Sequence, residues 1–235
     1  MDADYDLFAD TAAGDVRDPY PDYAAARRTA PVAEEEQFGQ TWVQVFRYAD
    51  VGAVLADPQT FSSSLYEEAM GPVMGTTILQ MDGHEHHVNR ALVASAFRRK
   101  ALESWETTLI GPAVHSLIDS FEKDGEADLV RQLTFLFPIR VIQGILGIPA
   151  GDERQFARWS IELISWAVDF ERGKAAARSI RGYVSGILHQ RRARPADDLI
   201  SSLAHAEIDG KRLSDDAIFG FLNLLMPAGA ETTYR

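Results

Sequence analysis

The segment Ile218-Phe-Gly-Phe-Leu-Asn-Leu-Leu-Met-Pro-Ala-Gly-Ala-Glu-Thr-Thr233 decides the fold. Its apolar residues point in nearly every direction around a helix, and a helix that is apolar all round is buried on all sides. The acids that follow Ser214 favour a helix start there, because they suit the positive end of the helix dipole. We therefore expect a central helix that begins at Ser214 and passes through the middle of a mainly helical protein.

The end of this central helix carries the residues best suited to chemistry. A carboxylate such as Glu231 is costly on a buried helix unless it is paired or solvated. Gly229 allows close approach of a ligand or a backbone, and Pro227 removes one helical hydrogen bond. One interpretation is a locally opened helix in which Glu231 and Thr232 relay protons into a dry pocket. The other is a helix that packs on a neighbour through Gly229 and frays beyond it.

The rest of the chain predicts more helices and one strand. Pro19 suits the first turn of a helix that ends near Thr29. The alternating segment 41–46 predicts a strand, followed by a helix from Tyr48 to Ala56. Residues 62–77 have no clear period and predict a long loop. Further helices are expected after Glu85, with an interruption at Gly111-Pro112, and over 129–146, 152–167, 175–194 and 199–205.

Composition excludes several classes of protein. The chain has 235 residues, 46% of them apolar, which is enough for a sizeable core. Its formal charge of -12 disfavours nucleic acid as a partner. Neither a long apolar run nor a signal peptide is visible, so we expect a cytoplasmic protein that does not cross a membrane. The absence of cysteine excludes disulfides, thiolate zinc sites and a cysteine nucleophile within these residues.

A second polar cluster is His84-Glu-His-His87 with Arg90. As a metal site it fails the spacing of the zinc-protease helix by one place, since the second histidine would have to replace Val88. His86 and Arg90 are four residues apart on one helical face, where two donors can hold a carboxylate or phosphate. A solvated polar face is the alternative. The nearby basic run, which comprises Arg98, Arg99 and Lys100, could steer an acidic partner.

Together these features resemble the bacterial soluble class of cytochrome P-450, the haem-thiolate monooxygenases. Five stretches in the order of that family carry the resemblance: 42–62 with its Trp42-Val-Gln-Val-Phe46 strand; Met81-Asp-Gly-His-Glu-His86 through Arg90 and Phe97; 129–149; Asp197-Asp-Leu199 with Leu213-Ser-Asp-Asp216; and Ala228-Gly-Ala-Glu-Thr232. The resemblance extends from about Asp18 to Arg235. It implies the amino-terminal part of the cytochrome P-450 fold, helices A to I with a small β region, as one incomplete domain over 1–235.

The resemblance also implies roles for particular residues. His86 and Arg90 would hold the haem propionates, and Ala228 and Gly229 would leave room for dioxygen. Thr232 would donate a hydrogen bond to the bound dioxygen, and Glu231 would feed protons inward. Residues 62–77, with Leu224 and Ala228, would line a pocket for an apolar substrate. A ferredoxin or flavodoxin that carries electrons derived from NAD(P)H would dock near the 98–100 run. Pro227 departs from the family pattern, so the bend there could differ.

The family's Glu-x-x-Arg helix and the loop with the iron-ligating cysteine have no counterpart in these residues. Thiolate ligation drives oxygen-bond cleavage in this class, so we expect no native monooxygenase activity from this chain alone. Three hypotheses remain open: part of a haem monooxygenase, a non-catalytic helical binding or scaffold protein derived from that family, and a metal-dependent hydrolase that uses the histidine cluster.

Overall fold

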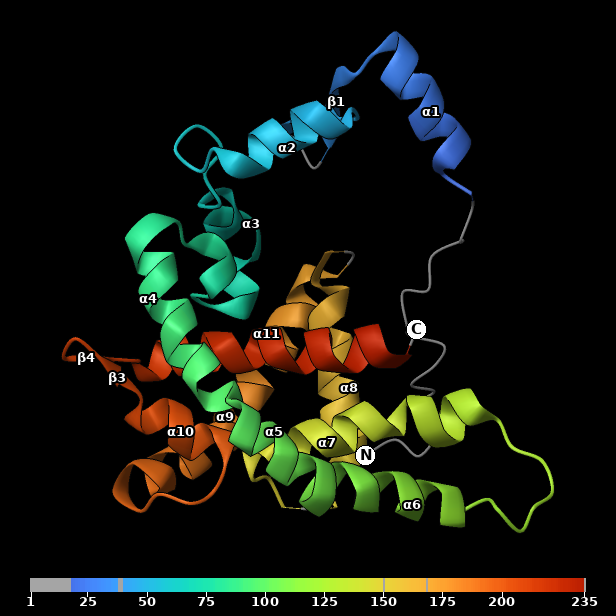
Figure 1. Cartoon of the computed structure of the whole chain (residues 1–235), viewed down its shortest axis with the longest axis vertical. Helices are drawn as coiled ribbons and strands as arrows, with labels where there is room; N and C mark the ends of the chain where they lie inside the picture. Colours follow the sequence, from blue (N-terminus) through green and yellow to red (C-terminus); the bar gives the residue numbers. More distant parts are fainter. Residues whose placement is uncertain (1–17, 38–39, 150, 168, 235) are drawn as a thin grey trace. The chain divides into compact units, whose positions relative to one another are not determined.

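The structure is a computed structural model that describes residues 18–37, 40–149, 151–167 and 169–234. Its described residues fall into two compact units, 18–63 and 64–234, which are taken separately below. The sequence predicted a single incomplete domain over 1–235, and that boundary stays a prediction. The mainly helical fold class is confirmed, with α11 (Asp215–Tyr234, red in Figure 1) as its last helix.

The first unit contains two helices and one hairpin. Helix α1 (Tyr20–Thr29) has Pro19 at its start, as expected, and α2 (Tyr48–Ala56) ends as predicted. Strand β2 (Gln40–Val45) matches the predicted strand and pairs antiparallel with β1 (Val32–Gln37), with Val32 opposite Val45. The sequence missed β1 because three consecutive glutamates interrupt any alternating pattern. None of the described residues of this unit is buried.

The loop predicted over 62–77 is wrong, because most of it forms helix α3 (Leu65–Met74) and a short 3-10 turn, η1 (Ile78–Gln80), follows. Met70, Val73 and Met74 are buried at helical spacing, although Pro72 lies between them. The helix ends at Gly75, which has a φ of 77°. Burial of three apolar side chains therefore outweighs the cost of proline inside this helix.

Next come helices that contain two π-helical turns. Helix α4 (Gly83–Ala94) leads through η2 (Ser95–Phe97) to α5 (Arg99–Trp105). The predicted interruption at Gly111-Pro112 takes the form of a π turn, η3 (Glu106–Ile110), before α6 (Gly111–Asp119). A second π turn, η4 (Val130–Thr134), precedes α7 (Leu136–Leu146), which Gly147 ends in the left-handed conformation. In each case the chain carries an extra residue in the helical turn.

The remaining helices surround α11. They are α8 (Glu153–Ile164) with the turn η5 (Ser165–Ala167), α9 (Phe170–Ala193) and α10 (Leu199–His205). The sequence placed the start of α9 five residues late, because Asp169 caps the helix by accepting from the Arg172 backbone N–H. Strands β3 (Glu207–Ile208) and β4 (Lys211–Arg212) form a hairpin whose turn residues, Asp209 and Gly210, both have positive φ.

Helix α11 lies in the middle of the second unit, as the sequence predicted, with α7 and α8 packed against it (Figure 1). Ile218, Leu222 and Met226 are at most 1% exposed. The helix is continuous through Pro227 to Tyr234. The opened turn of the first of our two interpretations is therefore not present in the described residues of this helix.

Candidate functional site

The predicted anion-holding pair lies on α4. His86 is half-buried and Arg90 is exposed. Within the part of the chain that the structure describes, neither side chain makes a hydrogen bond or an ion pair. Their four-residue spacing on a regular helix puts both donors on one side of α4. The structure keeps the spacing that the sequence suggested, and the role of the pair in holding a ligand's carboxylates stays a prediction.

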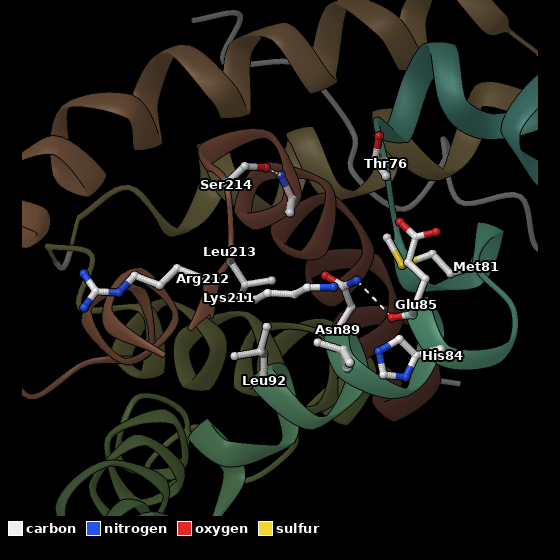
Figure 2. Close-up of a pocket in the computed structure, with 12 residues that line it drawn as sticks. Thr76, Met81, His84, Glu85, Asn89, Leu92, Lys211, Arg212, Leu213 and Ser214 are labelled. Atoms are coloured by element: carbon white, nitrogen blue, oxygen red, sulfur yellow. Dashed lines mark hydrogen bonds between the residues drawn. The ribbon is translucent and has the colours of Figure 1, made fainter. Parts of the chain in front are cut away.

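A different face of α4 borders a groove of about 500 Å³ (Figure 2). One side of the groove comes from α4 and the other from the β3–β4 hairpin and the start of α11. Asn89 donates its side-chain N–H to the Glu85 carbonyl at 3.0 Å. His86 and Arg90 do not belong to the lining, which comprises Thr76, Met81, His84, Glu85, Val88, Asn89, Leu92, Lys211, Arg212, Leu213, Ser214 and Ala217.

The end of α11 carries the predicted oxygen-handling residues. Ala228 and Thr232 are exposed, and Gly229 is half-buried. The Thr232 hydroxyl donates to the Ala228 carbonyl of its own helix at 2.6 Å. A Cβ on Gly229 would lie 2.7 Å from Cδ1 of Ile142, so the glycine lets α11 approach α7 closely. The side chain of Glu231 lies outside the described part of the structure.

The α4 groove and the predicted oxygen-handling residues lie at different levels of α11. The α4 groove reaches α11 at Ala217, and Thr232 follows 15 residues later. At 1.5 Å per residue, the two positions are about 22 Å apart along the helix axis. The close packing at Gly229 agrees with the interpretation of a glycine contact between helices. It leaves the proposed chemistry of Glu231 and Thr232 untested.

The basic run 98–100 is fully on the surface. Arg98 precedes α5, and Arg99 and Lys100 begin it. Arg99 pairs with Glu103 at 2.8 Å, and both side chains are more than half exposed, so this pair adds little to stability. The run is a positive surface in an acidic chain, as the sequence predicted.

Sequence reasoning missed a second groove, of about 290 Å³, between α3, α9 and α11. Its lining includes residues 71–76, which we had expected to help line a substrate pocket, but not the expected Leu224 or Ala228. It also includes Asn223, which is 5% exposed. The sequence signal for this groove was Asn223 itself, a single amide within the apolar run of the central helix. Nothing in the sequence around Arg178 and Arg181 on α9 indicated that they line a groove.

Two further properties concern the described residues alone. They contain no group of three or more His, Cys, Asp or Glu side chains arranged to hold a metal ion. No helix among them is both long enough and apolar enough to cross a bilayer.

Comparison with known proteins gives the family. A putative cytochrome P-450 of Bacillus subtilis, YjiB, is 33% identical over 228 residues, which cover 93% of this chain and 56% of that protein. The vitamin D(3) 25-hydroxylase of Pseudonocardia autotrophica is 33% identical over 237 residues, or 97% of this chain and 57% of that protein. The chain belongs to the bacterial cytochrome P-450 family. None of the protein-family models compared with the chain matches it.

Solved structures agree with this assignment to the cytochromes P-450. The crystal structure of CYP109E1 from Bacillus megaterium with testosterone has a TM-score of 0.70 at 32% identity, and the match covers 93% of this chain and 57% of that one. CYP109Q5 from Chondromyces apiculatus has a TM-score of 0.78 at 30% identity, over 93% and 56% of the two chains. The chain therefore spans about half the length of its cytochrome P-450 relatives and corresponds to the amino-terminal part of their fold.

Cytochromes P-450 imply haem, and the residues present fit part of a haem site. An imidazole and a guanidinium without partners among the described residues, His86 and Arg90, are suitable donors to two carboxylates. The thiolate that ligates iron in this family has no counterpart in these 235 residues, which contain no cysteine.

Proposed function

We propose that this chain supplies the propionate-holding and oxygen-handling residues of a haem monooxygenase. The similarity to cytochromes P-450 over more than nine-tenths of the chain carries the proposal. In the reaction, one oxygen atom of dioxygen enters a C–H bond of an apolar substrate, and the other leaves as water. Two protons and two electrons complete the balance, and the electrons come from NAD(P)H through a ferredoxin or flavodoxin.

Haem, when bound, would supply the activation of dioxygen. The residues of this chain would hold the haem and deliver protons to the dioxygen. His86 and Arg90 each donate hydrogen bonds to a propionate. Ala228 and Gly229, without bulky side chains, leave space beside α11 for dioxygen. Glu231 delivers protons, and the Thr232 hydroxyl directs them. Thr232 must first leave the Ala228 carbonyl to which it donates at 2.6 Å.

A redox partner would approach the positive run at Arg98, Arg99 and Lys100, because acidic electron carriers are steered by basic surfaces. Without a cysteine, this chain alone has no native monooxygenase activity under the proposal.

The first test is haem binding by the purified chain, followed by its absorption spectrum. Replacing both His86 and Arg90 by Ala should weaken haem binding by about tenfold or more, because each loses a charge-assisted hydrogen bond. His84→Ala with His87→Ala removes two histidines of the same helix and should leave binding unchanged. Equal haem affinity in all three proteins would contradict the assigned roles.

The second test concerns Thr232 in a protein that joins this segment to a cysteine-bearing remainder. Thr232→Ala should separate oxygen consumption from product formation, because the proton route loses its hydroxyl. Thr232→Ser keeps the hydroxyl and should restore coupling. Product yield per oxygen consumed is the measurement, and an unchanged yield in Thr232→Ala would rule out the role.

A further inference from the structure

The groove between α4 and the β3–β4 hairpin has an apolar base (Figure 2). Val88 and Leu92 of α4 and Leu213 of the opposite wall form this base, and each of them is at most 8% exposed. The volume of about 500 Å³ lies within the range of about 300–1,000 Å³ that is typical of small-molecule sites. The groove can therefore hold the hydrocarbon part of a small ligand.

The hairpin determines which of its two cations faces α4. Its turn residues, Asp209 and Gly210, are both left-handed, which suits a two-residue hairpin turn and sets the pairing of the strands. Successive residues of a strand point to opposite faces, so Lys211 and Arg212 diverge. Arg212 pairs with Glu207 at 2.6 Å, whereas Lys211 extends toward α4 (Figure 2).

The hairpin wall offers hydrogen-bond donors. Lys211 has no ion pair or hydrogen bond in the part of the chain that the structure describes. On the same wall, the Ser214 hydroxyl oxygen accepts from the Ala217 backbone N–H at 3.1 Å, which leaves the hydroxyl hydrogen available to donate. An ammonium group beside a hydroxyl suits the carboxylate of a ligand, because hydrogen bonds between ionised groups are the strong ones.

The α4 wall offers acceptors instead. Glu85 lies in the first turn of α4, where the helix dipole favours its negative charge, and it has no side-chain partner among the described residues. Asn89 donates its side-chain N–H to the Glu85 carbonyl at 3.0 Å, which orients the amide and leaves its side-chain oxygen as an acceptor. His84 lines the same wall, and a neutral imidazole accepts through one nitrogen. This wall therefore suits the ammonium group of a ligand.

Glu85 and Lys211 line one groove, yet no ion pair joins them in the described structure. On the same unit, Arg212 is paired with Glu207. Solvation alone would account for either charge, but it does not require an apolar base between an acceptor wall and a donor wall. A molecule that carries both charges and a hydrocarbon group matches all three parts of the groove at once.

We propose that this groove binds a free α-amino acid with an apolar side chain. Its carboxylate lies on Lys211, its ammonium group lies on Glu85, and its side chain packs against the apolar base. Each part of the ligand then meets a part of the lining with the complementary charge or polarity.

This site is separate from the residues assigned to haem and dioxygen, so the proposal does not rest on the proposed function. Neither His86 nor Arg90 belongs to the lining. The groove meets α11 at Ala217, about 22 Å along the helix axis from Thr232.

The test measures binding of leucine to the full 235-residue chain by calorimetry, beside three analogues that each lack one feature. Leucinamide lacks the carboxylate, N-acetylleucine lacks the ammonium group, and glycine lacks the apolar side chain. Leucine should bind at least about tenfold more tightly than each analogue, because each loses a charge-assisted hydrogen bond or the burial of its hydrocarbon.

Variants of the two walls should each remove one preference. Lys211→Gln should weaken leucine binding about tenfold and leave leucinamide binding unchanged, so that the two ligands bind nearly equally. Glu85→Gln should do the same for leucine and N-acetylleucine. Lys123→Gln and Glu122→Gln are the matched controls, since they replace an exposed lysine and an exposed glutamate outside the groove, and both should bind leucine normally.

Equal affinities for leucine and leucinamide, an unchanged leucine affinity in Lys211→Gln or Glu85→Gln, or no binding of leucine would each overturn the proposal. Circular dichroism checks that each variant is folded. The haem experiment is independent, since His86→Ala with Arg90→Ala should leave leucine binding intact.

Discussion

Tyr183 links two helices through a hydrogen bond that responds to pH. Its hydroxyl donates to Asp152 Oδ2 at 2.5 Å, and its ring packs edge-on against Phe156 and Trp159. Burial, together with the hydrogen bond to Asp152 and the negative charge of Asp152, raises the pKa of Tyr183 from 10.0 to about 12. The folded protein therefore keeps this phenol neutral at a pH where the unfolded chain ionises it.

This shift predicts a loss of stability at high pH. With the folded pKa above the unfolded one, the contribution of Tyr183 is complete below pH 10 and falls as the pH rises to about 12. Urea midpoints at pH 9 and pH 11 should therefore separate more in the natural protein than in Tyr183→Phe, which cannot ionise. An equal separation in the two proteins would show that Tyr183 is not the titrating group.

Replacing the glycines of α11 by alanine should lower the stability of the fold by different amounts. Gly220→Ala should destabilise the fold by about 1–3 kcal/mol or more, because its Cβ would meet the Thr76 backbone, which cannot rotate away. Gly229→Ala should cost less, since it meets only the end of the Ile142 side chain. Chemical denaturation measures both variants.

The control for this series is Gly186→Ala on α9, where an added Cβ would meet nothing within 4 Å. It should stabilise the protein by about 1 kcal/mol, because alanine is the better helix former. A Gly220→Ala protein as stable as the natural one would contradict the backbone contact between 76 and 220.

At the level of elements, Asp198 joins three helices. Its Oδ1 accepts from the Ser201 backbone N–H at 2.7 Å and so caps α10, while its Oδ2 accepts from Arg191 of α9 at 2.5 Å. Gly147, at the end of α7, lies so close that a Cβ there would be 2.3 Å from Oδ2. The carboxylate is 7% exposed, so both of its oxygens need these partners.

Asp198→Ala should therefore destabilise the protein by about 3–5 kcal/mol, since it leaves a partly buried guanidinium without its partner. The neighbouring pair of Arg192 with Asp215, whose carboxylate is 59% exposed, is the control. Asp215→Ala should cost about 0–1 kcal/mol. Thermal unfolding of the two variants gives the comparison, and similar losses would contradict the burial argument.

Elements differ in how well the sequence predicted them. The central helix could be predicted because its residues are apolar all round, which is typical of a helix buried on all sides. Helix α10 was predicted over the residues that form it. Helix α3 was missed because Gly71, Pro72 and Gly75 are typical of loops, whereas its stability comes from tertiary burial of Val73 and its neighbours. Local patterns do not reveal such partners.

The candidate site was predictable to a similar extent. The spacing of His86 and Arg90 on one helix face could be read directly, and the structure keeps it. The groove at Asn223 could not be predicted, because its walls come from segments about 100 and 150 residues apart in the sequence, brought together only by folding.

At the scale of the whole molecule, all the described residues that are buried belong to the second unit. The core of buried apolar residues begins at Met70, and no described residue of 18–63 is buried. A segment that buries so little apolar surface cannot offset its loss of conformational entropy. The first unit therefore buries too little apolar surface to fold independently.

A chain of residues 64–235 should consequently unfold in one cooperative urea transition, whereas residues 12–63 alone should show none. Circular dichroism at increasing urea concentration measures both. A sigmoidal transition in the short segment would contradict the inference, and so would a gradual loss of helix in the long one.

The two π turns make the chain sensitive to its length as well as to its composition. Each adds one residue to a helix, and one residue corresponds to a rotation of about 100°. Removing one residue from 106–110 would leave a regular helix with favourable hydrogen bonds, yet would turn Leu117 of α6 away from the interior. A regular helix here would thus have better local hydrogen bonds but would pack the wrong face against the interior. Deleting one residue would therefore be more damaging than most substitutions at the same positions.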